Sequence, residues 1–508
     1  MTGLPLKLRH LAKNSRPLDR AAIALMLVLS VLIGVVVLSG DRTTPRVREF
    51  SWANQQVGAE DRGFILTFNR PMDRESVEQN LRLDPPLPGK ISWAGKRMAY
   101  TLIDPVPYGT PFSVQLQGAR DKLYGDDREG QLLEPFTGYF RSRDRAFAYI
   151  GVRGDEEGRL MLVNLSRDPR PVPLTPPDLV VLEFEPYPEG DRVLFSAVAR
   201  SDRTQGQFDP QLHVTTTGIN PESTADKSTS PQAPGEVETV LESESYRNLK
   251  FDLAPDGEAI VVQRVHKTNP TDAGPWILEP GRSPKPLQTE GGDFLIGPDS
   301  QSLIIAQGPD LTTILPLEPE AEVLEYLPKF GQVLGFSSDG SAAAMLKFNS
   351  DGTRSLFLVN TQGTEKELYR TPEFGNILSA QFDPSGTILY CLITELLEEE
   401  SEEYIEQPYI VAIDLNTEDV VPLVILPNQQ EINLSLSPDG LALLFDQTVT
   451  QVMEEGVENR PRSGGGDTIT TSRLWLLPLA ADTSENGTAS QLQPEELPFL
   501  GFNPQWLP

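Results

Sequence analysis

The stretch Ile377–Thr394, ILSAQFDPSGTILYCLIT, decides the fold of this chain. Two apolar runs flank the tetrapeptide Asp-Pro-Ser-Gly. In such a turn, Pro fixes φ, Asp caps the turn through its carboxylate, and Gly adopts the φ > 0 conformation that starts a new strand. The stretch therefore predicts two antiparallel strands joined by a tight turn.

Turns of the same kind recur through the second part of the chain, at intervals of roughly 40 to 70 residues. The turns are Pro188–Gly190, Pro255–Gly257, Pro298–Ser300, Ser338–Gly340, Pro384–Gly386 and Pro438–Gly440. Each lies between two predicted strands, and a third strand and a weaker fourth strand follow. Four antiparallel strands per repeat predict the blade of a β-propeller.

The two ends of this region supply a seventh unit. Residues 146–152, 159–165 and 171–175 resemble a second, third and fourth strand without a first, and residues 498–504 resemble a first strand alone. Pairing these ends would close the ring and remove an exposed sheet edge. We therefore predict an all-β chain in which residues 146–508 form a seven-bladed propeller closed by N- and C-terminal strands, with six blades as the alternative.

The repeated turn also resembles a known family. FDPSGTILY (Phe382–Tyr390) and LSPDGLALLF (Leu436–Phe445) are similar to the TolB-like, WD-repeat-like class of β-propeller repeats. The turn at Ser300 departs from the pattern because it lacks glycine, and Pro186-Tyr-Pro-Glu-Gly190 has an altered turn. The resemblance implies the fold but no single function, since the class includes complex scaffolds, ligand binders and accessory domains of peptidases.

Residues 47–145 predict a separate β-sandwich, because strands with period-2 alternation follow one another at short spacing. FNRPMDRESV (Phe68–Val77), Trp93 and the run Tyr108–Val114 resemble the SbsA-type bacterial immunoglobulin-like domain, with a departure in the acidic insertion 125–130. This resemblance implies a spacer or adhesion module without catalytic residues. Asp61, Asp73 and Asp84 lack the spacing of a calcium loop and are interpreted as solvated turn residues.

The N-terminus predicts a membrane anchor. Residues 21–40 are apolar and reach roughly the length needed for a transmembrane helix, and a basic tail, residues 1–20, precedes them. The excess of basic residues upstream favours a cytoplasmic N-terminus with the rest of the chain outside the cytoplasm. A cleavable signal peptide is the alternative, although the apolar run is long and has a poor cleavage site.

The composition excludes several classes of function. The net charge is −30 and residues 1–20 carry five Lys/Arg against one Asp, so the remaining chain is still more acidic and repels nucleic acid. The single cysteine, Cys391, lies in an apolar run and is expected to be buried. His213 and His266 are expected to be structural, and no spacing typical of a metal site, a cofactor loop or a catalytic elbow is present.

Long loops indicate where a partner would bind, because binding sites are often carried by loops on a rigid scaffold. The second and third strands of the last two repeats are joined by residues 395–407 and 447–472, while residues 217–236 are expected to be a disordered loop on the opposite face. The candidate partner-binding residues are Glu398, Glu399, Glu400, Glu402, Glu403, Tyr404, Arg460 and Arg462.

These observations together predict a non-enzymatic, membrane-anchored scaffold of the bacterial cell envelope that binds a protein partner outside the cytoplasm, without cofactor, metal or nucleic acid. The alternative is a protein that binds glycan or cell wall, or a weak hydrolase that uses the propeller channel. The oligomeric state and the identity of the partner stay open.

Overall fold

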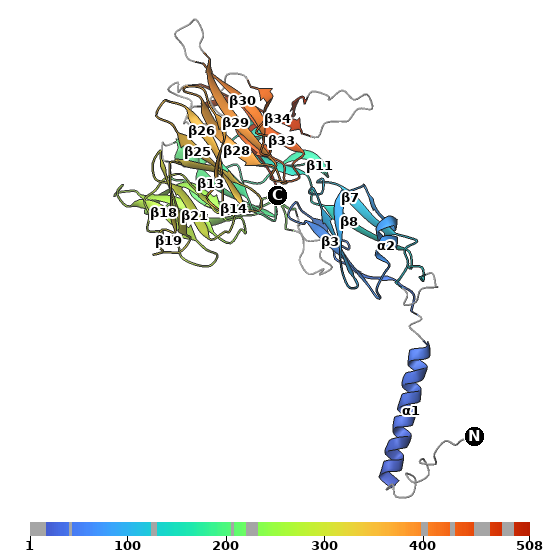
Figure 1. Ribbon diagram of the computed structural model, residues 1–508. Helices are drawn as coiled ribbons and strands as arrows, with labels where there is room; N and C mark the ends of the chain where they lie inside the picture. Colours follow the sequence, from blue (N-terminus) through green and yellow to red (C-terminus); the bar gives the residue numbers. More distant parts are fainter. Residues whose placement is uncertain are drawn as a thin grey trace, which may run out of the picture.

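The computed structural model describes residues 17–39, 43–122, 130–204, 208–219, 232–397, 405–426, 432–451, 468–479 and 492–508. Most of these residues lie in strands, which gather into two β regions, and one N-terminal helix stands apart from both (Figure 1).

The N-terminal helix is α1 (Pro17–Ser39), and its described side chains are mostly exposed. A search of the described residues finds no helix that is both long enough and apolar enough to cross a bilayer. This finding overturns the prediction of a single-pass membrane anchor that holds the N-terminus in the cytoplasm and the bulk of the chain outside it.

The first β region consists of two four-stranded sheets around one core. The first sheet has the order β1 (Val47–Phe50), β3 (Gly63–Phe68), β6 (Arg97–Leu102) and β5 (Gly89–Ala94). The second has the order β2 (Gln56–Val57), β8 (Phe136–Ser142), β7 (Pro111–Leu116) and β4 (Leu81–Asp84). Helix α2 (Arg74–Asn80) begins at Asp73, whose carboxylate accepts the backbone N–H of Ser76, so this residue is a helix cap. We call this region the sandwich.

The second β region, residues 146–508, consists of seven four-stranded antiparallel sheets, numbered here in chain order. Sheet 1 has the order β11 (Asp168–Pro173), β10 (Leu160–Asn164), β9 (Ala146–Gly151) and β36 (Gly501–Trp506). Sheet 2 has the order β12 (Leu179–Pro186), β13 (Arg192–Ala199), β14 (Gln211–Thr216) and β15 (Val237–Leu241). Sheet 3 has the order β16 (Tyr246–Leu253), β17 (Ile260–His266), β18 (Ala273–Leu278) and β19 (Lys285–Pro286). Sheets 4 and 5 are β20 (Phe294–Ile296), β21 (Ser302–Ala306), β22 (Leu311–Pro316) and β23 (Glu325–Pro328); and β24 (Gln332–Phe336), β25 (Ala342–Phe348), β26 (Arg354–Asn360) and β27 (Glu365–Arg370). Sheets 6 and 7 are β28 (Asn376–Phe382), β29 (Ile388–Leu397), β30 (Ile405–Asp414) and β31 (Val420–Ile425); and β32 (Leu434–Leu436), β33 (Ala442–Gln451), β34 (Thr468–Pro478) and β35 (Glu495–Glu496). A 3-10 turn, η1 (Gly154–Glu156), and helix α3 (Arg200–Thr204) complete the described elements.

Apolar cores join each sheet to the next. One core contains Phe184 and Phe195 of sheet 2 with Leu162 of sheet 1, and similar cores lie between the following pairs. The core between sheets 7 and 1 contains Leu444 and Trp506. The arrangement is consistent with a β-propeller.

The C-terminal strand pairs with the first strand of the region, as the sequence predicts. β36 runs antiparallel to β9, with Phe502 opposite Ile150 and Trp506 opposite Phe147. The indole of Trp506 is buried and meets the ring of Phe147 edge-on at 5.7 Å. The chain therefore fills the missing strand of sheet 1 with its own other end.

The tight turns also form as predicted. Gly386 has φ +69°, and the carboxylate of Asp383 accepts the backbone N–H groups of Ser385, Thr387 and Ile388. Ser300, the one non-glycine at this turn position, still adopts φ +56°. The carboxylate caps explain why the motif contains Asp before Pro or Gly.

Two predicted loops are shorter than expected, because the flanking strands continue into them. β29 and β30 pair as far as Leu397 opposite Ile405, and β33 and β34 pair as far as Gln451 opposite Thr468. The second and third strands of sheets 6 and 7 have 10 or 11 residues, whereas those of sheets 1 to 5 have 5 to 8. The two hairpins therefore project beyond the others, and Figure 1 shows β29 and β30 far from the sandwich.

Candidate functional site

Polar side chains of the first strands face the centre of the region. The first strands of neighbouring sheets contact one another, and β36 takes this place in sheet 1. We call the space between these strands the central channel. Its lining follows from strand alternation, because every second residue of a first strand points the same way.

One strand position connects each sheet to its neighbour. Glu185, five residues before the turn glycine of sheet 2, accepts the backbone N–H of Leu253 in sheet 3 at 2.9 Å. Asp252, at the same position in sheet 3, accepts the backbone N–H of Ile296 in sheet 4. Each side chain thus binds the backbone of the next first strand.

Amides occupy the same position on the other side of the channel. Gln381 of sheet 6 donates to the carbonyl of Leu434 at 2.6 Å and accepts the N–H of Leu436 at 2.8 Å. Gln505 of β36 donates to the carbonyl of Phe184 at 2.9 Å. A cavity of about 410 Å³ lies against these amide-bearing strands of sheets 6, 7 and 1.

Four carboxylates gather on the first side of the channel. Glu183, Glu185, Asp252 and Asp293, which we call the carboxylate cluster, come from sheets 2, 3 and 4. Lys250 forms an ion pair with Asp293 and donates to the carbonyl of Phe294 at 3.1 Å. One ammonium group faces four carboxylates, so the cluster has an excess of negative charge.

The cluster holds protons more tightly than ordinary carboxyl groups. Burial raises the pKa of Asp252 to about 7, and the negative charge of Glu183 adds to this effect. Burial and the charge of Asp252 raise the pKa of Glu185 well above its usual range. Burial also raises the pKa of Glu183, although its side chain is open to solvent in the channel. Asp252 therefore exchanges its proton near neutral pH, and the negative charge of the cluster changes with it.

The sandwich covers one end of the central channel. Arg143 donates to the carbonyl of Pro188 at 3.0 Å, in the turn of sheet 2, and pairs with Glu60 of the sandwich. Arg62, two residues after Glu60, donates to the carbonyl of Pro384 at 3.1 Å, in the turn of sheet 6. Sheets 2 and 6 are not neighbours, so the loop of residues 58–62 reaches from the turn of one to the turn of the other.

A buried aspartate fastens the sandwich in place. Asp439, in the turn of sheet 7, accepts the backbone N–H of Tyr108 at 2.9 Å and a guanidinium N–H of Arg145 at 2.6 Å. Its side chain has no exposed surface. The same carboxylate caps its own turn through Ser437 and Leu441, so one side chain both forms the turn and holds the sandwich.

The opposite mouth is on the side of the two long hairpins. In a four-stranded antiparallel meander, the connection between second and third strands lies at the end opposite to that between first and second strands. The hairpins β29–β30 and β33–β34 therefore rise from the face that the sandwich leaves uncovered.

The predicted partner-binding residues lie outside the described residues. This holds for Glu398, Glu399, Glu400, Glu402, Glu403, Tyr404, Arg460 and Arg462, and for 220–231 of the predicted disordered loop. The two described histidines contact neighbouring side chains. His213 is buried against the ring of Phe195 and bonded to Thr239 at 3.1 Å, and His266 meets Tyr246 edge-on.

Cys391 is buried as predicted, and burial raises the pKa of its thiol. Within the described part of the chain, no group of three or more His, Cys, Asp or Glu side chains could hold a metal ion.

Sequence reasoning missed the carboxylate cluster and the Asp439 contact. The cluster unites residues far apart in the chain, and acidic residues are too common here for one of them to stand out. Aligning the repeats on their turn residues would have found it, because Glu185 and Asp252 occupy the same position.

Comparisons with known proteins give only distant similarities. No protein-family model and no curated protein matches the chain. Among solved structures, TolB from Acinetobacter baumannii is similar at 12% identity and TM-score 0.37, covering 83% of this chain and 82% of that chain. An oligogalacturonate lyase in complex with manganese matches at 13% identity and TM-score 0.36, covering 68% and 84%. Prolyl oligopeptidase B from Galerina marginata matches at 9% identity and TM-score 0.43, covering 70% of this chain and 52% of that chain.

Two of these three similar structures are enzymes. The prediction that this chain is not an enzyme is therefore wrong as an exclusion, because the fold has enzymatic members.

Proposed function

We propose that the chain is a protein-binding scaffold. In this proposal the seven sheets are the blades of one closed TolB-like propeller, and a basic, extended segment of a partner protein enters the central channel. The observation that carries the proposal is the one-sided channel: the sandwich covers the turn-side mouth, while the acidic lining stays open toward the two long hairpins.

The charge of the lining supports a cationic partner. Glu183 and Asp293 are exposed. In the part of the chain that the structure describes, Lys250 pairs with Asp293, which also accepts an amide N–H of Gln332 at 2.7 Å. A concave wall of one charge sign concentrates field lines and attracts ligands of the opposite sign. Lysine or arginine side chains of an extended segment would bring opposite charge next to Glu183 and Asp293.

The hairpins supply a second contact surface in this proposal. In the sequence, residues 398–404 connect β29 to β30, and residues 452–467 connect β33 to β34. We propose that their acidic residues, Glu398 to Glu403, steer the basic partner toward the channel, since long-range attraction raises association rates. The sandwich, proposed to be an SbsA-type immunoglobulin-like module, acts as a rigid cover rather than as a ligand site.

The test uses peptides of defined charge. Fluorescence anisotropy measures the affinity of the full chain for a short Lys-Ala repeat peptide and for a Glu-Ala repeat of equal length. The channel double variant Glu183→Gln/Asp293→Asn is compared with Glu322→Gln/Asp310→Asn, which removes the same charge from exposed positions outside the channel.

The channel variant should bind the Lys-Ala peptide about tenfold more weakly, as expected for the loss of two ion pairs of about 0.7 kcal/mol each. The exposed variant should change the affinity less than twofold. Equal losses in both variants would mean that the peptide senses only the overall charge, and the proposal would fall.

A further inference from the structure

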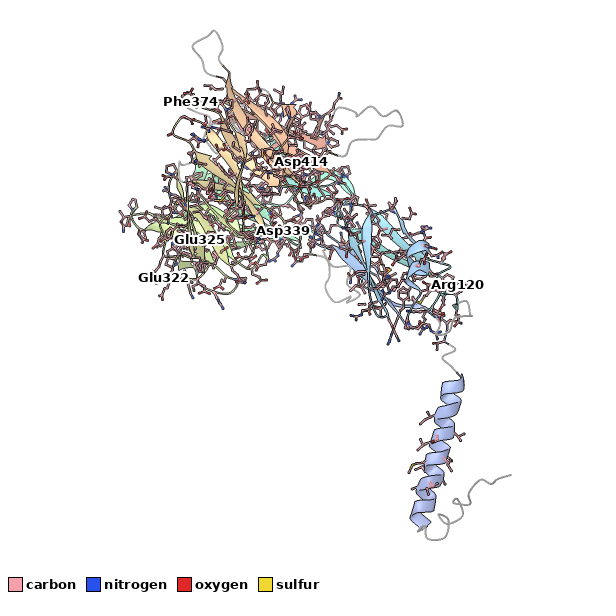
Figure 2. The ribbon with its side chains drawn as sticks, viewed as in Figure 1. Arg120, Glu322, Glu325, Asp339, Phe374 and Asp414 are labelled. Carbon is pink, nitrogen blue, oxygen red and sulfur yellow. The ribbon has the colours of Figure 1, made fainter. Side chains whose placement is uncertain are left out.

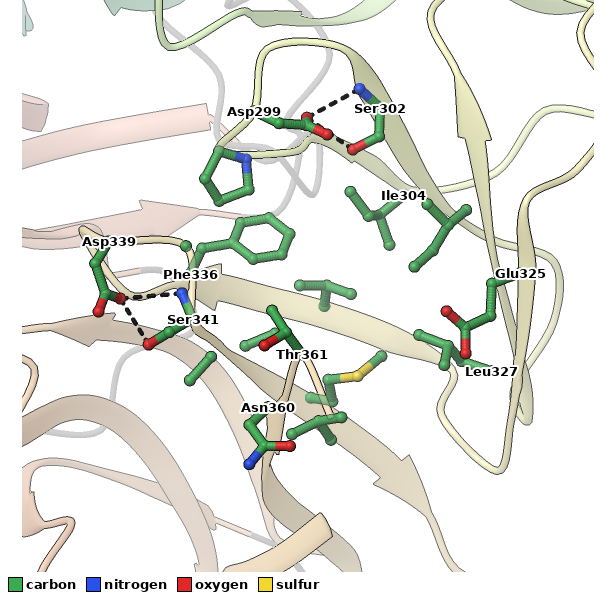
Figure 3. Close-up of a pocket in the computed structure, with 18 of the residues that line it drawn as sticks. Asp299, Ser302, Ile304, Glu325, Leu327, Phe336, Asp339, Ser341, Asn360 and Thr361 are labelled. Carbon is green, nitrogen blue, oxygen red and sulfur yellow. Dashed lines mark hydrogen bonds between the residues drawn. The ribbon is translucent and has the colours of Figure 1, made fainter. Parts of the chain in front are cut away.

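A second cavity, separate from the channel, lies between sheets 4 and 5 (Figure 3). Its volume is about 580 Å³, within the range of about 300 to 1,000 Å³ that is typical of small-molecule sites. Residues of the turns 298–300 and 338–340 form part of its rim, so it lies near the face that carries the sandwich.

The cavity exists because one position carries alanine instead of a larger residue. In the other sheets with this turn, the third residue after the turn position is Val193, Ile260, Leu303, Leu389 or Leu443. Each of these side chains is buried in the core shared with the preceding sheet. Sheet 5 has Ala343 there, and its core with sheet 4 is only partly filled.

The interior of this cavity is apolar. Ile304, Val333, Met345 and Val359 form its buried walls. The ring of Phe336 is half-buried and points into the cavity (Figure 3). An aromatic face next to an apolar wall suits a ligand with a hydrocarbon body.

The rim carries negative charge. Asp299, Glu325 and Asp339 line the cavity, and none of the described residues that line it is a Lys, Arg or His. Hydrogen bonds from the backbone N–H and hydroxyl of Ser341 lower the pKa of Asp339 to about 2, so this carboxylate is ionised at neutral pH. Within the described part of the chain, no hydrogen bond or ion pair engages the carboxylate of Glu325.

The guanidinium of Arg62 contacts the rim. It donates to the hydroxyl of Ser338 at 3.4 Å and to the carbonyl of Pro384 at 3.1 Å. Both contacts are directed toward the sandwich interface, and Arg62 is not among the residues that line the cavity. Arg62 therefore leaves the carboxylate of Glu325 available to a cation.

We propose that this cavity binds a small amphipathic cation, an alkyl chain that ends in a quaternary ammonium group. The alkyl chain packs between Ile304 and Met345. The ammonium group lies near the carboxylate of Glu325, where opposite charge favours it, and the alkyl chain extends across the cavity toward the ring of Phe336. A carboxylate or sulfate in place of the ammonium group would face only negative charges.

Isothermal titration calorimetry on the full chain tests this proposal with decyltrimethylammonium below its micelle-forming concentration. Decanoate, which has a similar apolar chain and the opposite charge, is the matched ligand. The cation should bind with a stoichiometry of one and at least about tenfold more tightly than the anion. Equal affinities, or no binding of the cation, would refute the proposal.

Two variants locate the site. Ala343→Leu fills the cavity with a side chain that the equivalent positions already carry, and it should abolish binding while the chain unfolds at an unchanged or higher temperature. Binding that persists in this variant would place the ligand elsewhere.

Glu325→Gln should weaken cation binding about threefold. Glu322→Gln removes the same charge from an exposed neighbouring position and should leave the affinity unchanged (Figure 2). An equal loss in both variants would contradict the proposal.

Discussion

Replacing Asp252 by Asn should stabilise this protein at high pH and leave it nearly unchanged at low pH. The carboxyl group lies on the first strand of sheet 3, beside Glu183 and Glu185, and accepts the backbone N–H of Ile296. An asparagine side-chain oxygen can accept the same hydrogen bond without carrying charge. The variant therefore removes the ionisation and keeps the contact.

The expected size of the effect follows from the pKa of Asp252. Its ordinary value is 3.8, and burial, with the charge of Glu183, raises it to about 7. One pKa unit corresponds to about 1.4 kcal/mol, so ionising Asp252 in the folded chain costs at most about 4 kcal/mol more than in the unfolded chain.

Whether the free energy of unfolding rises or falls with pH depends on which state, folded or unfolded, holds the proton of Asp252. Below about pH 4, folded and unfolded chains both carry it, and ionisation costs nothing. Between about pH 4 and 7 the folded chain keeps the proton that the unfolded chain has lost, so the free energy of unfolding falls as pH rises. Above about pH 7 the full cost is present in the natural chain and absent from Asp252→Asn.

Urea unfolding at a series of pH values measures this difference. The gain in unfolding free energy of Asp252→Asn should rise from near zero at pH 4 toward a plateau at pH 8. Asp310→Asn, at an exposed position, serves as the control and should show no such rise. A parallel pH dependence of the natural chain and Asp252→Asn would refute the argument that this carboxylate is forced to ionise in a poorly solvated place.

Three further predictions concern the framework. Asp439→Ala removes the contacts that hold the sandwich and should cost about 2 to 3 kcal/mol, measured as earlier unfolding or faster proteolysis between the two β regions. Gly386 has φ +69° and open space where a Cβ would lie, so Gly386→Ala should lower the free energy of unfolding by about 1 kcal/mol. Gly440→Ala should lower it clearly more, because its Cβ would lie 2.8 Å from Pro384. Equal losses in urea unfolding would contradict the argument that the contact with Pro384 adds to the cost. Trp506→Ala empties a buried site on the closing strand and should lower the free energy of unfolding by about 3 to 5 kcal/mol, and a loss below about 1 kcal/mol would show that strand closure contributes little.

Local chemistry explains what could be predicted from the sequence. A turn such as Asp383–Gly386 fixes its own geometry through neighbouring residues, so its strands and their antiparallel pairing follow from a few letters. The pairing of β36 with β9 is predictable for a similar reason. A first strand without later strands and a set of later strands without a first strand each leave an exposed sheet edge, and pairing them removes it.

The sites could not be predicted in the same way, because they depend on contacts between repeats. Asp439 reads as an ordinary turn residue until Tyr108 and Arg145 of another region are placed beside it. Ala343 reads as one of several alanines until it is aligned with Leu389 and its equivalents in the other sheets. Both residues stand out only when equivalent positions of the repeats are compared, because each differs from its equivalents in its contacts or its size.

The comparison of Glu185 with Gln381 bears on why the channel is acidic. Both side chains stand at the same position and bind the next first strand, but Gln381 satisfies one N–H and one carbonyl, while Glu185 accepts one N–H. Burial raises the pKa of Glu185, so its charged form is also disfavoured by lost solvation. An amide would therefore join the sheets at least as well as the acid. Stability alone does not account for carboxylates at this position in sheets 2 and 3, whereas the cation binding proposed above would return the lost electrostatic free energy.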